Sequence, residues 1–360
     1  MSAAPQHVPL VVETRGVGVA QSVESVHYGS VAVVDAQGQT LWAAGDLAAP
    51  IFSRSTLKPL QALPFIEAGG IAHYDLTDED LALLCASHSG EDRHVAITDR
   101  LLALAGCTEA HLQCGCHVPL RFSMLDKAPP ARARFDQRYN NCSGKHAGFL
   151  AYCRMSDTPV ETYLDEGHSL QRAIRARTAR LAGVDEASLA VGIDGCSAPN
   201  LALPLPALAR LYAWLALPDQ APEAALDEQA RLDTRTSLAR LGQAMSRHPG
   251  LVSGEGRSDL HFVQAFATPE GGSDMVAKIG AAGVQLFGLR SAGLGVAIKI
   301  ADGHAASLHC AAVAVLEQLG LLDDTRRQAL AAYARPALRN HRGTVTGELR
   351  PVFMLQRPAP

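Results

Sequence analysis

The sequence lacks a long uninterrupted hydrophobic run, and this absence argues against a protein that spans a membrane. The most apolar stretch, residues 201–218, is interrupted by Pro204, Pro206 and Arg210, whereas a bilayer span needs about 20 predominantly apolar residues. We therefore expect this stretch to form a buried helix of a soluble protein. The segment Met1–His7 also lacks a basic region followed by an apolar run, so no signal peptide is expected.

Neither sign of charge is in excess. The chain has 32 Lys and Arg against 36 Asp and Glu, a net charge of −4, which gives no basic surface for nucleic acid or an anionic membrane. Eight cysteines in 360 residues are too few for a disulfide scaffold, and together with the missing signal peptide they indicate a reducing, cytoplasmic location. Hydrophobic residues make up 48%, which excludes a disordered chain and allows a sizeable core.

Lysine is scarce, with five lysines against 27 arginines. Arginine keeps its proton at any accessible pH, whereas a buried lysine amine can become a neutral base or a metal ligand. A genomic preference for arginine codons explains the overall ratio, but not why individual lysines lie in unusual local sequences. The five are Lys58, Lys127, Lys145, Lys278 and Lys299.

Strand patterns at the two ends of the chain flank a middle with helical spacing. Residues 30–34 and 40–44 predict an antiparallel hairpin, and a capping box at 77–80 predicts the start of a helix. Further strands are expected at 274–280, 284–287 and 295–300, and further helices at about 55–67 and 305–319.

This pattern indicates an α/β protein with a mixed, mostly antiparallel sheet that is flanked by helices and carries a helical insertion. We expect residues 1–360 to form a single catalytic unit. The sheet would come from about 8–60 and 255–360, and the mainly helical and loop part from about 61–254.

The spacing Ser55-x-x-Lys58 places a hydroxyl and an amine on one face of a helix. Serine is a weak nucleophile unless a neighbouring base takes its proton, and a lysine held away from bulk water is neutral enough to do so. The start of a helix adds free N–H groups and positive potential, which suit an oxyanion or a carboxylate. By itself the spacing equally fits a capped helix with a solvated lysine.

Two later segments extend this pattern. Ser87 lies in a polar turn after an apolar helix, and Lys278 comes two residues before Gly280 in an otherwise apolar strand. The order Ser-x-x-Lys, serine loop and Lys-x-Gly strand is that of the serine β-lactamases and penicillin-binding proteins. We therefore expect that type of fold, and we interpret Lys278 as a functional residue rather than an edge-strand cation.

Loop cysteines form a candidate metal site. Cys114 and Cys116 share one short segment, and Cys142 and Cys196 each lie in a loop rich in Gly, Asn or Asp. Two thiolates with a nitrogen or oxygen ligand make a plausible zinc site, although the chain has no Cys-x-x-Cys or His-x-x-x-His spacing. The remaining cysteines are interpreted as small buried residues; they are Cys85, Cys107, Cys153 and Cys310.

Taken together, five segments resemble the class 3 L-asparaginases, the rhizobial-type or asparaginase II family. They are residues 53–59, 86–91, 141–146, 194–200 and 278–283. The resemblance covers nearly the whole chain in order. It implies an enzyme that hydrolyses L-asparagine to L-aspartate and ammonia, with a penicillin-binding-protein-like fold and a homodimeric assembly.

The resemblance also implies catalytic roles for matching residues. Ser55 would be the nucleophile and Lys58 its base, and Ser87 and Lys278 would form a second Ser–Lys pair. Ala282 stands where the family usually has an acidic residue, so the chain departs from the family pattern at this position.

A metal site and a substrate site are implied in the same way. Cys142, Lys145 and Cys196 would be zinc ligands, with water completing the shell, and coordination would require a neutral lysine amine. Because a nucleophile is already supplied, the zinc would be structural or would orient the substrate. Arg54 and Asp194 would face the α-carboxylate and α-amino groups of L-asparagine.

Two other functions fit parts of this pattern. A penicillin-recognising acyl enzyme shares the nucleophile and base, but its substrates lie outside the cytoplasm. A non-catalytic zinc-dependent amino-acid-binding protein explains the cysteines but gives no reason for two Ser–Lys pairs.

Overall fold

The computed structural model describes residues 6–16, 21–221, 223 and 230–358, apart from the side chains of residues 230–233. Contacts divide the chain into two compact units. We call Met1–Thr56, Leu203–Ala213 and Ala277–Pro360 the sheet unit, and Leu57–Ala202 and Trp214–Val276 the helical unit. Within the described residues, no helix is both long enough and apolar enough to cross a bilayer.

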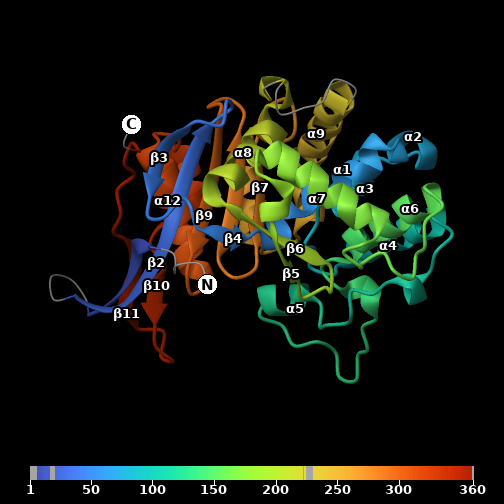
Figure 1. Cartoon of the computed structure of the whole chain (residues 1–360). Helices are drawn as coiled ribbons and strands as arrows, with labels where there is room; N and C mark the ends of the chain where they lie inside the picture. The colour runs from blue at the N-terminus through green and yellow to red at the C-terminus, as the bar shows by residue number, and fades with distance from the viewer. Residues whose placement is uncertain (1–5, 17–20, 222, 224–229, 359–360) are drawn as a thin grey trace. The chain divides into compact units, whose positions relative to one another are not determined.

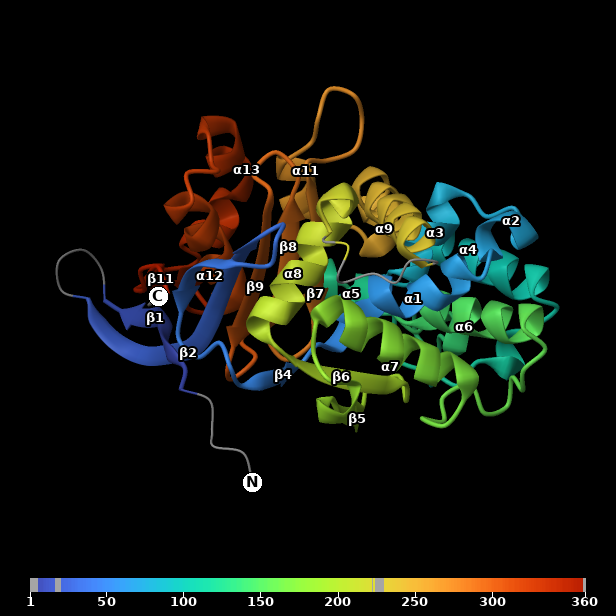
Figure 2. The ribbon, with the colours of Figure 1, turned by 45° about the horizontal axis from the view of Figure 1, so that its top comes forward.

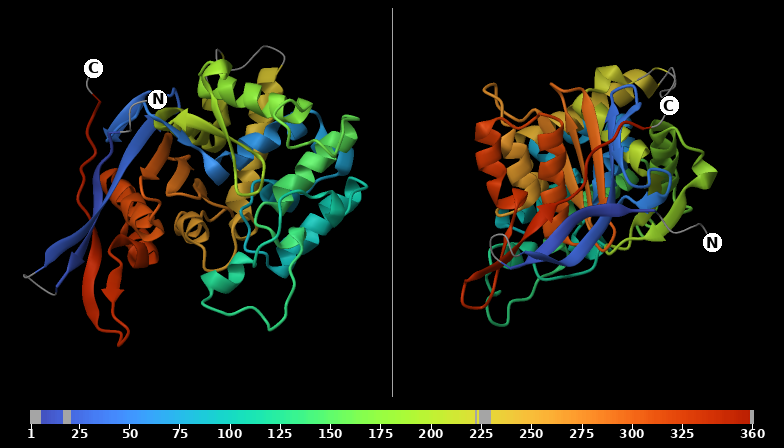
Figure 3. Two further views of the ribbon diagram at one scale, coloured as in Figure 1. Left: turned by 60° about the horizontal axis from the view of Figure 1, so that its bottom comes forward. Right: turned by 90° about the vertical axis from the view of Figure 1, so that its left-hand side faces the viewer.

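The sheet unit is built on a sheet with the strand order β10-β11-β1-β2-β9-β8-β7, and β3 pairs with β2 beside this path. Each strand pair from β10 along to β8 is antiparallel, as is β2 with β3. Figure 3 shows the long β1 and β2 side by side with β11. The strands are β1 (Val8–Arg15), β2 (Ser22–Asp35), β3 (Thr40–Ala44), β7 (Met275–Gly280), β8 (Val284–Leu289), β9 (Leu294–Ile300), β10 (Ala337–Arg339) and β11 (Val345–Pro351).

Helices cover this sheet, because its central strands are apolar on both faces. Every residue of β8 is buried, as expected for a strand enclosed by two layers. The helices are α12 (Ala305–Gln318), α13 (Asp324–Ala334) and residues 205–213 of α8 (Leu205–Ala216), and α12 and α8 lie on either side of β9 in Figure 2. At Gly295 in β9, an added Cβ would lie only 2.0 Å from the Ala209 carbonyl oxygen of α8, so this close approach requires glycine.

The helical unit is arranged around α1 (Lys58–Glu67), whose residues are buried from Lys58 through Ile66. Helices α3, α6, α7 and α9 contact it and surround the blue α1 in Figure 1. The other elements are α2 (Gly70–Tyr74), α3 (Asp78–Leu84), α4 (Asp92–Leu104), α5 (Leu120–Met124), α6 (Ser143–Met155), α7 (Ser169–Ala182), α9 (Ala230–Arg247), α10 (Pro249–Val252) and α11 (Ser258–Ala265), with the antiparallel strands β5 (Ala190–Ile193) and β6 (Pro199–Pro204). The 3₁₀ turn η1 (Arg54–Leu57) and the strand β4 (Pro50–Phe52) precede α1.

The expected architecture, a mostly antiparallel sheet flanked by helices, is confirmed. The hairpin forms as β2 and β3, and Thr77 and Asp80 make the predicted capping box at the start of α3. The late strands appear as β7, β8 and β9, and the late helix as α12.

One expected element is wrong. Residues 201–218 were expected to be helical throughout, but residues 201–204 belong to β6 and the helix begins at Leu205. Proline at 204 and 206 explains the boundary, since proline disfavours helical backbone at the preceding residue and is tolerated in the first helical turn. Residues 1–5 of the segment used for the signal-peptide prediction lie outside the described residues.

Candidate active site

Ser55 lies in η1, which runs directly into α1. The turn is closed by Thr56, whose backbone N–H and side-chain Oγ1 both donate to the Ser53 carbonyl oxygen, at 3.2 and 2.6 Å. Tyr212 Oη donates to the Thr56 carbonyl oxygen at 2.7 Å. Arg54 has a left-handed backbone with φ of +52°, a conformation that is uncommon for a residue with a Cβ and that concentrates at functional sites.

Lys58 is the first residue of α1 and is only 1% exposed. Its Nζ donates to the Ala86 carbonyl oxygen, to Ser87 Oγ at 2.9 Å and to the Asn141 carbonyl oxygen at 3.3 Å. The sequence predicted that Lys58 and Ser87 would belong to one site, and the helical unit brings their side chains into direct contact.

The loop that carries Ser87 is held by backbone hydrogen bonds. The Ser87 N–H donates to the Val252 carbonyl oxygen at 2.9 Å, and the His88 N–H donates to the Asn141 carbonyl oxygen at 3.1 Å. The His88 ring is fully buried and forms a 2.9 Å hydrogen bond with Ser143 Oγ. Burial holds the pKa of His88 well below its ordinary value, so this ring is neutral.

Lys278 lies on β7 and its side chain is completely buried. Its Nζ donates to the carbonyl oxygen of the next residue, Ile279, at 3.0 Å. At Gly280 an added Cβ would be 3.2 Å from the Ser53 carbonyl oxygen and from Arg54 Cβ. Within the sheet unit, the end of β7 therefore lies against the turn that carries Ser55.

The expected metal ligands Cys142, Lys145 and Cys196 meet in the helical unit, and all three are buried. Lys145 Nζ donates to Cys196 Sγ at 3.2 Å, and the Cys142 thiol donates to Asn141 Oδ1 at 3.5 Å. The neighbouring Cys142 thiol, and then the Lys145 charge, lower the pKa of Cys196 although burial opposes this. Burial alone would lower the pKa of Lys145, but the two sulfurs raise it overall.

These shifts favour a charged Lys145 amine beside a Cys196 thiolate, with the Cys142 thiol keeping its proton. Among the described residues, no group of three or more His, Cys, Asp and Glu side chains is arranged to hold a metal ion. A metal site at this position would have to include the Lys145 amine. Two sulfur donors and one amine that meet at a buried position nevertheless fit the ligand chemistry of zinc.

Asp194 begins the tight turn that presents Cys196. The Ser197 N–H donates to the Asp194 carbonyl oxygen, and the Asp194 N–H donates to the Ala198 carbonyl oxygen, both at 2.9 Å. Ser197 has φ of +68°, a second non-glycine residue with left-handed backbone in a predicted motif. Ile193, immediately before this turn, is 83% exposed.

The model of the family described as L-asparaginase II matches residues 14–351. The chain belongs to the L-asparaginase II family. No curated protein matches it. Among solved structures, a β-lactamase from Mycobacterium bovis is similar, with a TM-score of 0.40 and 15% identity over 85% of this chain and 95% of that one.

In this L-asparaginase II family member, backbone groups complete the surroundings of Lys58, and sequence reasoning missed them. The carbonyl groups of Ala86 and Asn141 both accept from the Lys58 amine, yet no residue type encodes a carbonyl position. Cys114 also lies near the cluster; burial, and then the Cys196 charge, raise the pKa of Cys114 to about 12. All eight cysteines are free, and Cys116 is exposed.

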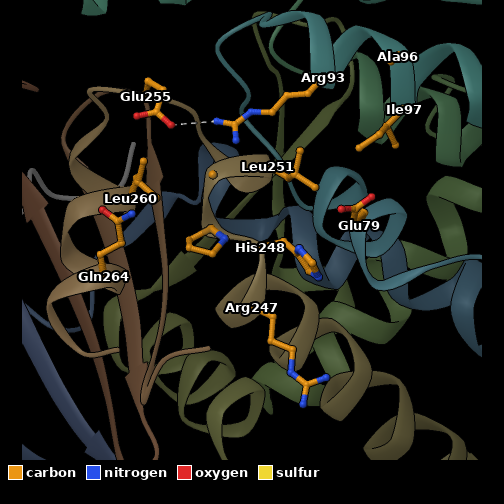
Figure 4. A pocket seen from close by; sticks show the side chains of 12 residues that line it. Glu79, Arg93, Ala96, Ile97, Arg247, His248, Leu251, Glu255, Leu260 and Gln264 are labelled. Carbon is orange, nitrogen blue, oxygen red and sulfur yellow. Dashed lines mark hydrogen bonds and ion pairs between the residues drawn. The ribbon is translucent and has the colours of Figure 1, made fainter. Parts of the chain in front are cut away.

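A groove of about 600 Å³ in the helical unit is lined by none of the predicted site residues. Figure 4 shows Arg93 and His248 in it, with Arg93 paired to Glu255 at 3.3 Å. Arg93 also pairs with Glu91 at 2.8 Å, so its charge is already compensated. One wall, Leu251, comes directly before Val252, the residue that accepts from the Ser87 N–H.

Proposed function

We propose that the chain is an amidohydrolase that converts L-asparagine and water into L-aspartate and ammonia through a serine nucleophile and a lysine base. Membership of the L-asparaginase II family supports hydrolysis of an amide of this class. The observation that carries the catalytic part is the buried contact between Lys58 and Ser87 in the helical unit.

The surroundings of the Lys58 amine favour proton exchange with a hydroxyl. Two of its three neighbours, the Ala86 and Asn141 oxygens, are carbonyls that only accept hydrogen bonds. A neutral amine has two N–H groups and one lone pair, so these carbonyls would take both N–H groups. The lone pair would then be available to accept the proton of a hydroxyl, and Ser87 Oγ lies 2.9 Å from the amine.

In the proposed course, the Ser55 oxygen attacks the side-chain amide carbon while Lys58 accepts the serine proton. The C–N bond then breaks, and the departing nitrogen receives a proton from Lys58, with Ser87 and Lys278 assisting the transfer. Water hydrolyses the resulting ester and releases L-aspartate. Backbone N–H groups at the start of α1 would stabilise the oxyanion, a contribution of about 2.7–4 kcal/mol per donor.

We assign the residues that bind the substrate from the charges they carry. Arg54 would bind the α-carboxylate and Asp194 the α-amino group of L-asparagine. Each residue lies in or beside a backbone turn with left-handed residues, at Arg54 and at Ser197. Turns of this kind hold side chains in fixed directions, which suits the binding of a small zwitterion.

Cys142, Lys145 and Cys196 would hold one zinc ion. Such an ion neutralises thiolate charge and fixes the segments that supply its ligands. Because Ser55 supplies the nucleophile, we assign the ion a structural or substrate-orienting role. Binding would require Lys145 to lose the proton that it carries beside Cys196.

The deciding experiment measures ammonia release from L-asparagine and L-glutamine by the full chain, with and without a chelator. We expect release from L-asparagine that falls at least 1,000-fold in Ser55→Ala, while zinc content measured by elemental analysis stays unchanged. Turnover near the wild-type rate in Ser55→Ala would contradict the serine mechanism.

Parallel assays separate the other functions. Hydrolysis of nitrocefin without ammonia release would indicate a penicillin-recognising enzyme. Calorimetric binding of L-asparagine with no ammonia released would indicate a binding protein.

We also propose a homodimer, which sedimentation measurements of the full chain test directly.

A further inference from the structure

Lys299 is a scarce lysine that the proposed function does not use. It lies on β9 and is half-buried, whereas Lys127, also unassigned, is exposed. The Lys299 Nζ donates to the carbonyl oxygen of Ala282 and, at 2.8 Å, to that of Ile300. Because the Lys299 amine on β9 bonds to the Ala282 carbonyl, it links β9 to the turn between β7 and β8.

That turn, residues 281–283, has a left-handed backbone at two successive residues. Ala282 has φ of +58° and Gly283 has φ of +71°. Glycine adopts this conformation freely, but alanine is disfavoured there because of its Cβ. An alanine persists in such a conformation only when its surroundings hold it, and the Lys299 bond to the Ala282 oxygen is a contact that does so.

The same turn sets the position of the end of β7. Gly280 packs so closely on the 53–56 turn that an added Cβ would lie 3.2 Å from the Ser53 oxygen, from Arg54 Cβ and from Thr56 Cγ2. Lys278 comes two residues before Gly280, and Ser55 lies within the opposing turn. A change in the 281–283 turn would therefore alter how the strand of Lys278 meets the segment of Ser55.

The pKa of Lys299 is lowered from its ordinary value. Burial, and then the charge of Arg54, lower the pKa of Lys299, while Asp302 opposes the shift. Asp302 is itself engaged, because its carboxylate bonds to His27 Nδ1 at 2.7 Å and accepts from the His304 N–H at 3.0 Å. Lys299 is thus bonded to Ala282, in the turn that directly follows Gly280.

We propose that Lys299 is a positioning residue for the hydrolytic reaction. By bonding to the Ala282 carbonyl it keeps the 281–283 turn left-handed, and so it keeps the end of β7 with Lys278 against the turn that carries Ser55. This inference rests on the proposed function. It requires no contact between Lys299 and the substrate.

The test compares Lys299→Met with Lys127→Met. The second variant is the control, because it makes the same substitution at an exposed lysine. In Lys299→Met we expect kcat for L-asparagine to fall at least tenfold while KM changes less than threefold; Lys127→Met should match the wild type. Ala282→Gly removes the Cβ that disfavours the left-handed turn. The double variant Lys299→Met/Ala282→Gly should therefore recover kcat to within threefold of Ala282→Gly alone.

Hydrogen exchange measured by mass spectrometry gives a readout that does not need activity. We expect amide exchange in peptides covering 279–284 and 53–57 to be faster in Lys299→Met and to return towards the wild-type rate in the double variant. If the wild type hydrolyses no amide, the proposed function fails, whereas this exchange pattern still tests the link.

Three results would overturn the proposal. The first is an unchanged kcat in Lys299→Met. The second is a rise in KM alone, which would make Lys299 a substrate contact. The third is a double variant no more active than Lys299→Met. If Lys299→Met does not fold, Lys299→Gln is measured in the same way, with the same recovery by Ala282→Gly expected.

Discussion

Lys58 owes its environment to groups that a sequence only partly reveals. Ser87 and Lys58 were predicted to share a site, because the family resemblance implied two Ser–Lys pairs packed together, Ser55 with Lys58 and Ser87 with Lys278. The carbonyls of Ala86 and Asn141, which fix the direction of the amine, were not predicted, since every residue has a carbonyl. Lys145 and Cys196, 51 residues apart, were paired only by the family resemblance.

At this scale Ser87 and Ser89 offer a matched comparison. Both are buried in one loop, but Ser87 Oγ contacts Lys58 Nζ, whereas Ser89 Oγ has no hydrogen-bond partner among the described residues. We expect Ser87→Ala to lower kcat for L-asparagine at least tenfold, because the amine loses its only hydroxyl neighbour among the contacts described above. Steady-state kinetics should show Ser89→Ala within twofold of the wild type. Equal losses in the two variants would mean that the loop responds to any lost hydroxyl.

At the scale of elements, the sequence correctly predicted those features that depend on residues close together in the chain. The capping box of α3 and the hairpin of β2 and β3 depend on residues close in sequence, and both form. The pairing of β2 with β9 joins residues about 260 positions apart, such as Val33 with Val296. Its register depends on tertiary packing, which no local pattern contains. The same limit made residues 201–204 appear helical, because an apolar run is compatible with either structure.

The start of α4 predicts a pH-dependent stability. His94 Nδ1 accepts from the Glu91 N–H at 3.1 Å, and Nε2 bonds to the Gly250 carbonyl at 2.9 Å, so the neutral ring is required. Burial lowers the pKa of His94 from 6.5 to about 4. The unfolded chain takes up this proton near pH 6.5 and the folded chain only near 4. The contribution is therefore complete above pH 6.5 and is lost as the pH falls to 4, roughly 3 kcal/mol in all.

Thermal unfolding at pH 7.5 and pH 5.0 measures this effect. The wild type should lose several degrees more between the two values than His94→Gln, whose side chain does not titrate. His94→Gln should still lose some stability at the lower pH, because burial also lowers the pKa of His88 in the same region. Identical losses in both proteins would show that His94 is not a source of acid sensitivity.

At the scale of the whole molecule, the scarcity of lysine matches the distribution of burial. Lys58, Lys145 and Lys278 are 1%, 3% and 0% exposed, Lys299 is half-buried, and Lys127 is exposed. Buried lysines are rare in proteins unless they are paired or functional. The sequence suggested this pattern from the unusual local context of individual lysines, but it could not separate Lys127 from Lys299, because exposure is a property of the folded chain.

Acetylation of lysine side chains by an amine-reactive reagent at pH 8, followed by mass spectrometry, tests this distribution. We expect Lys127 to react first and Lys299 more slowly. Lys58, Lys145 and Lys278 should react at least 100-fold more slowly than Lys127, because a buried amine meets the reagent only when the surrounding structure opens. In guanidinium chloride all five should react at similar rates, which controls for intrinsic reactivity. If Lys58 or Lys278 reacted as fast as Lys127 in the folded protein, these amines would be open to the reagent, which would contradict their burial.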